Sequence, residues 1–95
     1  MTKYSLTVSA LAEDDLRDLY RFGFFNWGEQ TADEYRDALL EHFNLLCENP
    51  FMFQAVDDIQ EGYRRSVCKA HAIYYRVFDA HVEIMAVVKH QDFGG

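Results

Sequence analysis

Residues 62–88 decide the fold of this chain. Residues 62–69 read GYRRSVCK, residues 72–78 read AIYYRVF and residues 82–88 read VEIMAVV. Each run is rich in β-branched and aromatic residues, and short polar breaks separate the three runs. Strands that follow one another through tight turns pair antiparallel. The sequence therefore predicts a three-stranded antiparallel meander.

The basic residues of this stretch are divided between the two faces of the predicted sheet. Side chains alternate across a strand, and the odd-numbered positions of the second run are the more apolar, so they should face the helices. Tyr74 and Arg76 then lie on the open face. One of Arg64 and Arg65 joins them there, and the strand register decides which. These arginines either contact carboxylates or phosphates of a partner or pair with the acidic residues 57–61.

The residues before this stretch predict one strand and two helices. Apolar and polar residues alternate over residues 4–8, as in a half-buried strand. Ser9 is a good N-cap for a helix that should run to about Trp27, where the following glycine breaks it. A second apolar stripe, at steps of three and four residues, predicts a helix that begins with a capping box at Thr31 and stops near Pro50.

These elements together define the expected fold class. Two consecutive helices joined by a short turn form an antiparallel hairpin. Residues 51–61 show no sustained period, so we expect an irregular connector there. Helices grouped on one side of a mostly antiparallel sheet are typical of α+β folds. We therefore expect one α+β domain over residues 1–95, with an N-terminal strand, an antiparallel two-helix hairpin and the three-stranded meander.

Two aromatic residues of the first helix do not fit its apolar stripe. That stripe recurs at steps of three and four residues and consists of Ala12, Leu16, Leu19, Tyr20, Gly23 and Trp27. Phe22 and Phe25 project with Asp15 and Asp18, toward the side that the pattern assigns to solvent. Large exposed aromatic side chains usually contact a partner. The alternative is that a loop or the edge of the N-terminal strand covers them. Both interpretations remain open at the level of sequence.

Charge is distributed unevenly along the chain. The formal net charge is −7; residues 1–63 hold 4 basic and 13 acidic side chains, whereas residues 64–95 hold 5 basic and 3 acidic ones. A chain with this negative balance is unsuited to salt-driven coating of nucleic acid. We expect no direct sequence-specific binding to nucleic acid, and one charge-selective face in the basic half.

The sequence also indicates in which cellular compartment the protein is expected. No run of about 18 apolar residues is present, so neither a membrane span nor a membrane partner is expected. The first residues show no signal-peptide pattern, and Cys47 and Cys68 are expected to be reduced thiols. These features predict a cytoplasmic protein.

Little in the sequence points to catalysis or metal binding. Cys68 and His71 lie three residues apart, but nothing supplies the third group that would orient a thiol–imidazole nucleophile. The four histidines are scattered singly, without the spacing of zinc ligands. His42 falls on the apolar stripe of the second helix, so we expect it neutral and hydrogen-bonded at the core margin. No catalytic residue, metal site or cofactor is expected.

Several segments, in this order and spacing, resemble the ParE toxins of the RelE/ParE superfamily. They are Trp27-Gly28, LLCENP at residues 45–50, DIQEGYRR at residues 58–65 and HAIYYRV at residues 71–77. The strand that begins VEI at Val82 and the histidine near its end, His90, continue the likeness. The resemblance covers about residues 4–92.

The resemblance implies a function. ParE toxins belong to type II toxin–antitoxin pairs and poison DNA gyrase, which halts replication. Their antitoxin, ParD, is encoded beside them and wraps a flexible segment over the toxin. A ParE-like chain is therefore expected to bind gyrase, or the gyrase–DNA complex, and to be neutralised by a ParD-like antitoxin.

The superfamily also contains ribosome-dependent mRNA endonucleases of the RelE type. RNA cleavage through the 2′-hydroxyl requires a base, an acid and cations that stabilise the phosphorane. RelE-type toxins take these groups from basic residues of the sheet and a tyrosine near the C-terminus. Here Ala86 stands where many relatives carry arginine, and residues 90–95 contain no tyrosine. The sequence therefore favours a toxin that acts by binding over the RelE-type alternative.

The tail departs from the ParE pattern as well. A histidine followed closely by arginine and aspartate is usual there, whereas this chain has His90 and Asp92 without an arginine. A degenerate, non-toxic module that only binds an antitoxin is therefore a third interpretation. Residues expected to bind the target or the antitoxin are Arg64, Arg65, Tyr74, Arg76, His90, Phe22 and Phe25.

Overall fold

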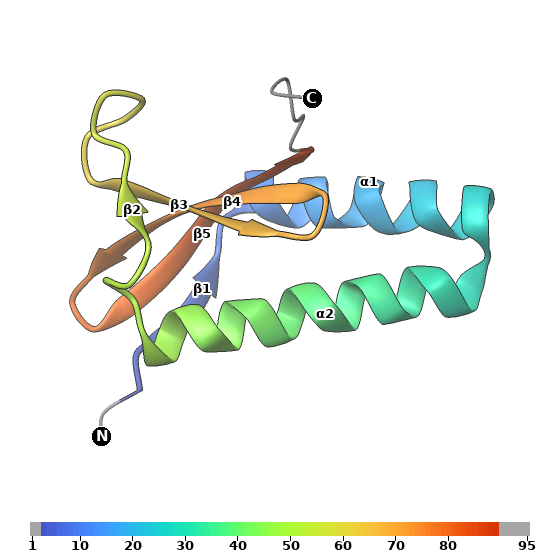
Figure 1. Cartoon of the computed structure of the whole chain (residues 1–95), viewed down its shortest axis with the longest axis horizontal. Coiled ribbons are helices and arrows are strands. Elements are labelled where there is room, and N and C mark those ends of the chain that lie inside the picture. The colour runs from blue at the N-terminus through green and yellow to red at the C-terminus, as the bar shows by residue number, and fades with distance from the viewer. Residues whose placement is uncertain (1–2, 90–95) are drawn as a thin grey trace.

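Two long helices and a five-stranded sheet form the structure, a computed structural model that describes residues 3–89 (Figure 1). The elements are β1 (Ser5–Val8), α1 (Ala10–Trp27), α2 (Glu29–Glu48), β2 (Gln54–Ala55), β3 (Tyr63–Cys68), β4 (His71–Phe78) and β5 (His81–Lys89). The order of strand, two helices and meander is the one predicted, and the fold is α+β. His90 lies outside the described residues.

The sheet is larger than the predicted meander. Its strand order is β1-β5-β4-β3-β2; β3, β4 and β5 pair antiparallel as predicted, whereas β1 pairs parallel with β5. The expectation of a wholly irregular connector was wrong at Gln54 and Ala55, which pair with β3. Their local sequence has no strand pattern, and the pairing depends on the free edge of β3, which lies far along the chain. The result is a mixed sheet.

Gly28 joins the two helices directly. Its φ of 93° lies in the region that favours glycine, its N–H donates to the carbonyl of Phe24, and its own carbonyl accepts from the N–H of Ala32. One residue therefore reverses the chain, and α2 begins at Glu29. The predicted capping box at Thr31 was wrong, because no loop precedes the second helix. The Ser9 cap of α1 is confirmed: its hydroxyl accepts from the N–H of Ala12 at 3.1 Å.

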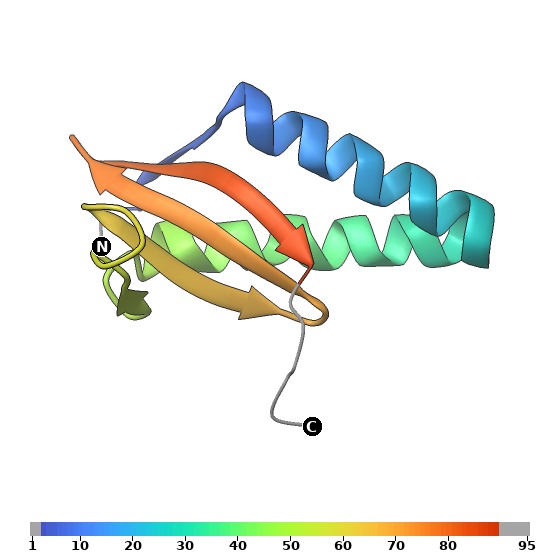
Figure 2. The same ribbon diagram turned by 90° about the horizontal axis from the view of Figure 1, so that it is seen from above.

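α2 lies across one face of the sheet, α1 runs along the edge of β5, and the joined end of the two helices projects past the end of the strands (Figures 1 and 2). The core contains Leu39, Phe43 and Leu46 of α2 together with Ile73 and Tyr75 of β4, all fully buried. The odd-numbered positions of β4 thus face the helices, as predicted. The Tyr75 hydroxyl donates to the carbonyl of Pro50 at 2.9 Å and so ties β4 to the segment that follows α2.

The start of α1 completes the edge of β5 where β1 ends. Pairing of β1 with β5 stops at Val8, and the register of β5 against β4 shifts at a bulge around Met85. The Ser9 hydroxyl donates to the Met85 carbonyl at 3.1 Å, and the Asp15 carboxylate accepts from the N–H of Val87 at 3.0 Å. Side chains of α1 therefore satisfy strand groups that lack a neighbouring strand.

Two histidines connect α2 with the sheet. His42 Nε2 lies 2.6 Å from the Ser66 hydroxyl, and His71 Nδ1 lies 2.7 Å from the Tyr35 hydroxyl. Burial lowers the pKa of His42 below its ordinary value. Burial, with a smaller effect of the Lys89 ammonium, lowers the pKa of His71 as well. His42 is thus half-buried and hydrogen-bonded, as predicted.

We predict that Asp15→Ala destabilises the protein by about 1–3 kcal/mol, because it leaves the N–H of Val87 without a partner. The measurement is the free energy of unfolding from urea titration. Asp14→Ala is the matched control. Asp14 is exposed and forms a surface ion pair with Arg17, so its replacement should cost about 0.5 kcal/mol or less. Equal losses for both variants would disprove the bond to β5 as a stabilising contact.

The protein should also become less stable as the pH is lowered below about 6.5, the ordinary pKa of histidine. Because the folded pKa values of His42 and His71 are lowered, the unfolded chain binds more protons in that window, and stability rises with pH up to about 6.5. Urea titrations between pH 5 and 8 measure this slope. The double variant His42→Gln/His71→Gln should show a flatter profile, and an unchanged slope would refute the histidine origin.

Candidate interaction surfaces

Four large aromatic side chains lie exposed at the joined end of the helices. The exposed fraction is 56% for Phe22, 40% for Phe24, 79% for Phe25 and 64% for Trp27. Phe22 meets Trp27 edge-on at a centroid distance of 5.3 Å, and Phe24 meets Phe25 at 5.5 Å. We call these four residues the aromatic end. Over residues 3–89 neither a loop nor β1 covers it.

The aromatic end contains more residues than the sequence suggested. Phe22 and Phe25 are exposed as the helical pattern predicted, but Trp27 was assigned to the buried stripe and Phe24 was not singled out. The stripe loses its cover here because the hairpin extends beyond the sheet (Figure 2). Near the joined end of the two helices, the buried helical residues are Gly23 and Ala32, where α1 and α2 are in contact. The run FGFFNW at residues 22–27 is the sequence feature from which all four aromatic residues of this cluster could have been identified.

A cavity of about 280 Å³ lies beside the aromatic end, between the hairpin and the end of the sheet. Phe22 and Trp27 of α1, Tyr35 of α2, His71 at the start of β4 and Lys89 at the end of β5 line it with mostly apolar surface. The sequence did not predict this cavity, because its walls come from α1, α2, β4 and β5, which meet only in the fold.

Two polar side chains of the cavity wall, Tyr35 and His71, contact each other. The Tyr35 hydroxyl accepts from the N–H of Ala70 at 3.1 Å and lies 2.7 Å from His71 Nδ1. Burial raises the pKa of the Tyr35 hydroxyl and lowers that of the His71 imidazole, so burial favours the neutral form of both groups. Tyr35 therefore positions the β3–β4 turn against α2 through its contacts with Ala70 and His71.

The open face of the sheet carries Arg65, Tyr74 and Arg76. Register places Arg65 opposite Tyr74, with its Nε donating to the Tyr74 hydroxyl at 3.3 Å, which answers the question that the sequence left open. Arg76 pairs with Glu83 at 2.7 Å and lies over the ring of Phe78 at 4.8 Å. Of the two alternatives that the sequence left open, pairing with the acidic residues 57–61 does not apply to Arg76, whose ion pair is with Glu83.

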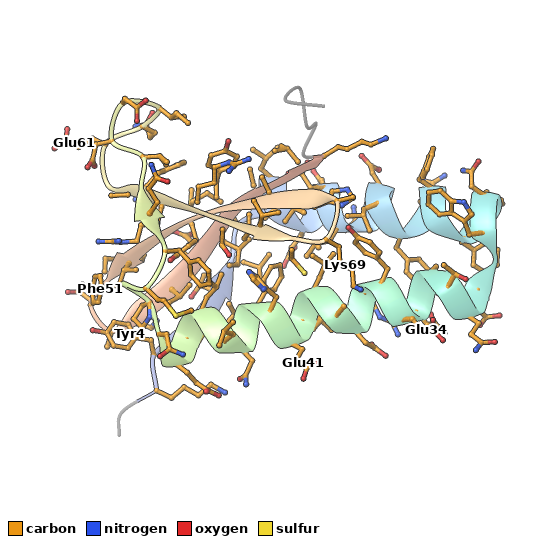
Figure 3. The ribbon with its side chains drawn as sticks, in the orientation of Figure 1. Tyr4, Glu34, Glu41, Phe51, Glu61 and Lys69 are labelled. Carbon is orange, nitrogen blue, oxygen red and sulfur yellow. The ribbon has the colours of Figure 1, made fainter. Side chains whose placement is uncertain are left out.

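Arg64 lies on the face of β3 that is turned toward the helices. Its Nη1 donates to the carbonyl of Phe53 at 2.7 Å, and its guanidinium lies 5.1 Å from the ring centroid of Phe51. Phe51 meets Tyr4 edge-on at 6.2 Å, and Figure 3 shows the two rings side by side at the end of the sheet far from the hairpin turn. Arg64 thus holds the connector onto β3, and its role in binding stays a prediction.

Residues 3–89 offer few side chains suited to metal binding or nucleophilic catalysis. Within residues 3–89, no group of three or more His, Cys, Asp or Glu side chains is arranged to hold a metal ion. Among the same residues, no helix is long and apolar enough to cross a membrane. Cys47 and Cys68 are buried free thiols, and burial raises the pKa of both. A raised thiol pKa lowers nucleophilicity at neutral pH.

Solved structures of similar fold come from toxin–antitoxin systems. A chain of the chromosomal ParDE system of Pseudomonas aeruginosa superimposes with a TM-score of 0.82 at 16% identity, covering 94% of this chain and 98% of that one. A chain of the RelBE2 complex of Mycobacterium tuberculosis gives 0.73 at 18% identity, covering 94% and 100%. At these identities the likeness establishes the fold alone.

Sequence comparison establishes the family. Toxin ParE1 of Caulobacter vibrioides is 33% identical over 81 residues, which cover 85% of this chain and 83% of the relative. A family model described as "ParE toxin of type II toxin-antitoxin system, parDE" matches residues 6–92. With the strand, the helical hairpin and the meander in the expected order, the chain belongs to the ParE toxin family of type II toxin–antitoxin systems.

Proposed function

We propose that this toxin inhibits DNA gyrase by binding to it, or to the gyrase–DNA complex, and that a ParD-like antitoxin neutralises it. The observation that carries the antitoxin part of the proposal is the aromatic end, four large side chains that residues 3–89 leave exposed. Such a cluster on a small protein is typical of a protein-binding surface. Membership of the ParE toxin family supports gyrase and a ParD-like antitoxin as the partners, and inhibition would take place in the cytoplasm, where gyrase acts.

The open face supports binding rather than RNA cleavage. Glu83 balances the charge of Arg76 at 2.7 Å, so this arginine offers little net positive charge to a phosphorane. Ala86 stands opposite Tyr74, at the position where the RelE-type resemblance would require arginine. Arg65 and Tyr74 remain suited to carboxylate or phosphate recognition on a partner, since guanidinium groups form paired hydrogen bonds with both.

The helical hairpin and the open face of the sheet differ in charge. Residues 10–48, which form the hairpin, hold 10 acidic and 3 basic side chains, so the hairpin accounts for the whole formal net charge of −7. Glu41 of α2 points away from the sheet (Figure 3). An antitoxin segment that covers the hairpin therefore needs apolar side chains for the aromatic end and Lys or Arg around them. We assign the hairpin to the antitoxin, and the open face with Arg65, Tyr74 and Arg76 to the gyrase target. His90, which lies outside the described residues, is proposed for the same target on the family resemblance alone.

The gyrase proposal is tested with relaxed plasmid, purified gyrase, ATP and purified toxin. We expect loss of supercoiling and accumulation of cleaved plasmid, both reversed by prior addition of the antitoxin encoded beside the toxin. Full supercoiling at a large molar excess of toxin would rule the proposal out. In that case, cuts within ribosome-bound codons of translated mRNA would identify the RelE-type activity, and normal growth of cells expressing the toxin alone would identify a non-toxic module.

The antitoxin surface is tested with the double variant Phe22→Ser/Phe25→Ser. Exposed anchor residues of an interface cost about 2 kcal/mol or more when truncated, so affinity for the antitoxin should fall about 30-fold or more. Urea unfolding should be unchanged, because both rings are mainly in solvent.

Leu11→Ser is the matched control for this variant. Leu11 is 61% exposed on the same helix but at its opposite end. Its affinity for the antitoxin should stay within twofold of the unchanged chain. Equal binding by the control and the double variant would remove the aromatic end from the interface, and unfolding of the double variant would assign the rings to the core.

A further inference from the structure

The cavity beside the aromatic end is large enough to hold a side chain. An apolar protein cavity of about 150 Å³ accommodates benzene, and this one measures about 280 Å³. Phe22 and Trp27 belong both to the cavity wall and to the aromatic end, so a segment that covers the rings also passes over the cavity mouth. The two features form one continuous surface.

Gly23 enlarges the cavity at its inner wall. A methyl group at this position would lie 3.6 Å from Ala32 Cβ and 3.9 Å from Trp27 Cε3, both ordinary contact distances. Gly23 has no positive φ and no steric clash that would require glycine. Alanine would also be the better helix former. The glycine therefore leaves unfilled a space that the fold itself does not need.

The charge at the cavity differs from that of the rest of the hairpin. Lys89 is the only charged side chain among the described residues that line it. Within residues 3–89 Lys89 makes no ion pair, and its ammonium is close enough to His71 to oppose protonation of the imidazole. A ligand that fills the apolar space therefore gains most if it places a negative group beside Lys89.

We infer that the cavity is an anchor site for one aromatic or branched apolar side chain of the antitoxin, flanked within one or two residues by a carboxylate that pairs with Lys89. The inference rests on the proposed function, since it takes the antitoxin as the occupant. A second copy of this chain is disfavoured because it would bring another hairpin of charge −7 against the first. The carboxylate is a local exception to the basic character expected of the rest of the segment.

The first test is the affinity of full-length toxin variants for the antitoxin encoded beside the toxin, measured by calorimetry. Gly23→Ala should bind at least 10-fold more weakly while its midpoint of thermal unfolding stays the same or rises, a combination that misfolding cannot produce. Lys89→Glu should also bind at least 10-fold more weakly. Lys69→Glu, the same charge change in the neighbouring β3–β4 turn, should stay within twofold.

Each contrary result has a defined meaning. Unchanged affinity of Gly23→Ala overturns the anchor site, and equal weakening by Lys89→Glu and Lys69→Glu overturns the carboxylate pairing in favour of general attraction. Failure of the unchanged toxin to bind this antitoxin, or a dimer of the toxin that Gly23→Ala dissolves, overturns the antitoxin as occupant. Failure of the unchanged toxin to bind this antitoxin would count against the proposed function as well.

The second test does not need the antitoxin. Trp27 is the only tryptophan of the chain, so its fluorescence reports on the cavity. The probes are the blocked dipeptides acetyl-Phe-Asp-amide and acetyl-Phe-Lys-amide. The acidic probe should change the Trp27 emission saturably, at a midpoint at least threefold lower than the basic one, and Lys89→Glu should abolish that preference. Equal midpoints, or no saturable change with either probe, would overturn the ligand chemistry.

Discussion

The packing of α2 against the sheet is the contact on which the rest of the structure depends. Leu39, Phe43 and Leu46 meet Ile73 and Tyr75 without exposed surface, and the Tyr75 hydroxyl holds the carbonyl that follows the helix. Because these buried residues occupy the middle and end of α2, the beginning of that helix extends beyond the strands. α1 follows it, because Gly23 and Ala32 bring the two helices into contact.

This geometry explains why the hairpin turn carries exposed aromatic rings. A residue such as Phe25 would normally be covered by a further layer, and the sheet supplies none at this point (Figure 1). The cavity has the same origin, since it fills the angle between the projecting helices and the end of β5. Exposed rings, an apolar cavity and a cation at its rim are the features from which we propose the antitoxin site.

Local patterns predicted much of the fold, and long-range contacts account for the rest. The Ser9 cap, the buried stripe of α2 and the inward positions of β4 depend on residues close in sequence, and they were predicted. The parallel pairing of β1 with β5 joins segments some 76 positions apart, and β2 exists only because β3 offers an edge. Gly28 shows a third limit, because the capping box at Thr31 was a valid local signal that a one-residue reversal overrode.

The interaction surfaces also divide into features set by local sequence, which could be predicted, and features set by long-range contacts, which could not. The exposure of Phe22 and Phe25 could be predicted because helical phase is local, whereas Arg64 and Arg65 could be assigned to their faces only with the strand register. Trp27 was misassigned because helical phase alone does not show where a helix leaves the sheet. The cavity could not be predicted at all, since it requires Tyr35, His71 and Lys89 to meet.

The central claim is that the hairpin binds the antitoxin and the open face of the sheet binds the target. Amide hydrogen exchange of the toxin, alone and with each partner, tests this division most directly, because contact slows exchange of the covered backbone. The account predicts slower exchange at residues 22–35 with the antitoxin and at residues 63–78 with gyrase. Antitoxin-induced slowing confined to residues 63–78, with the hairpin turn unchanged, would contradict it.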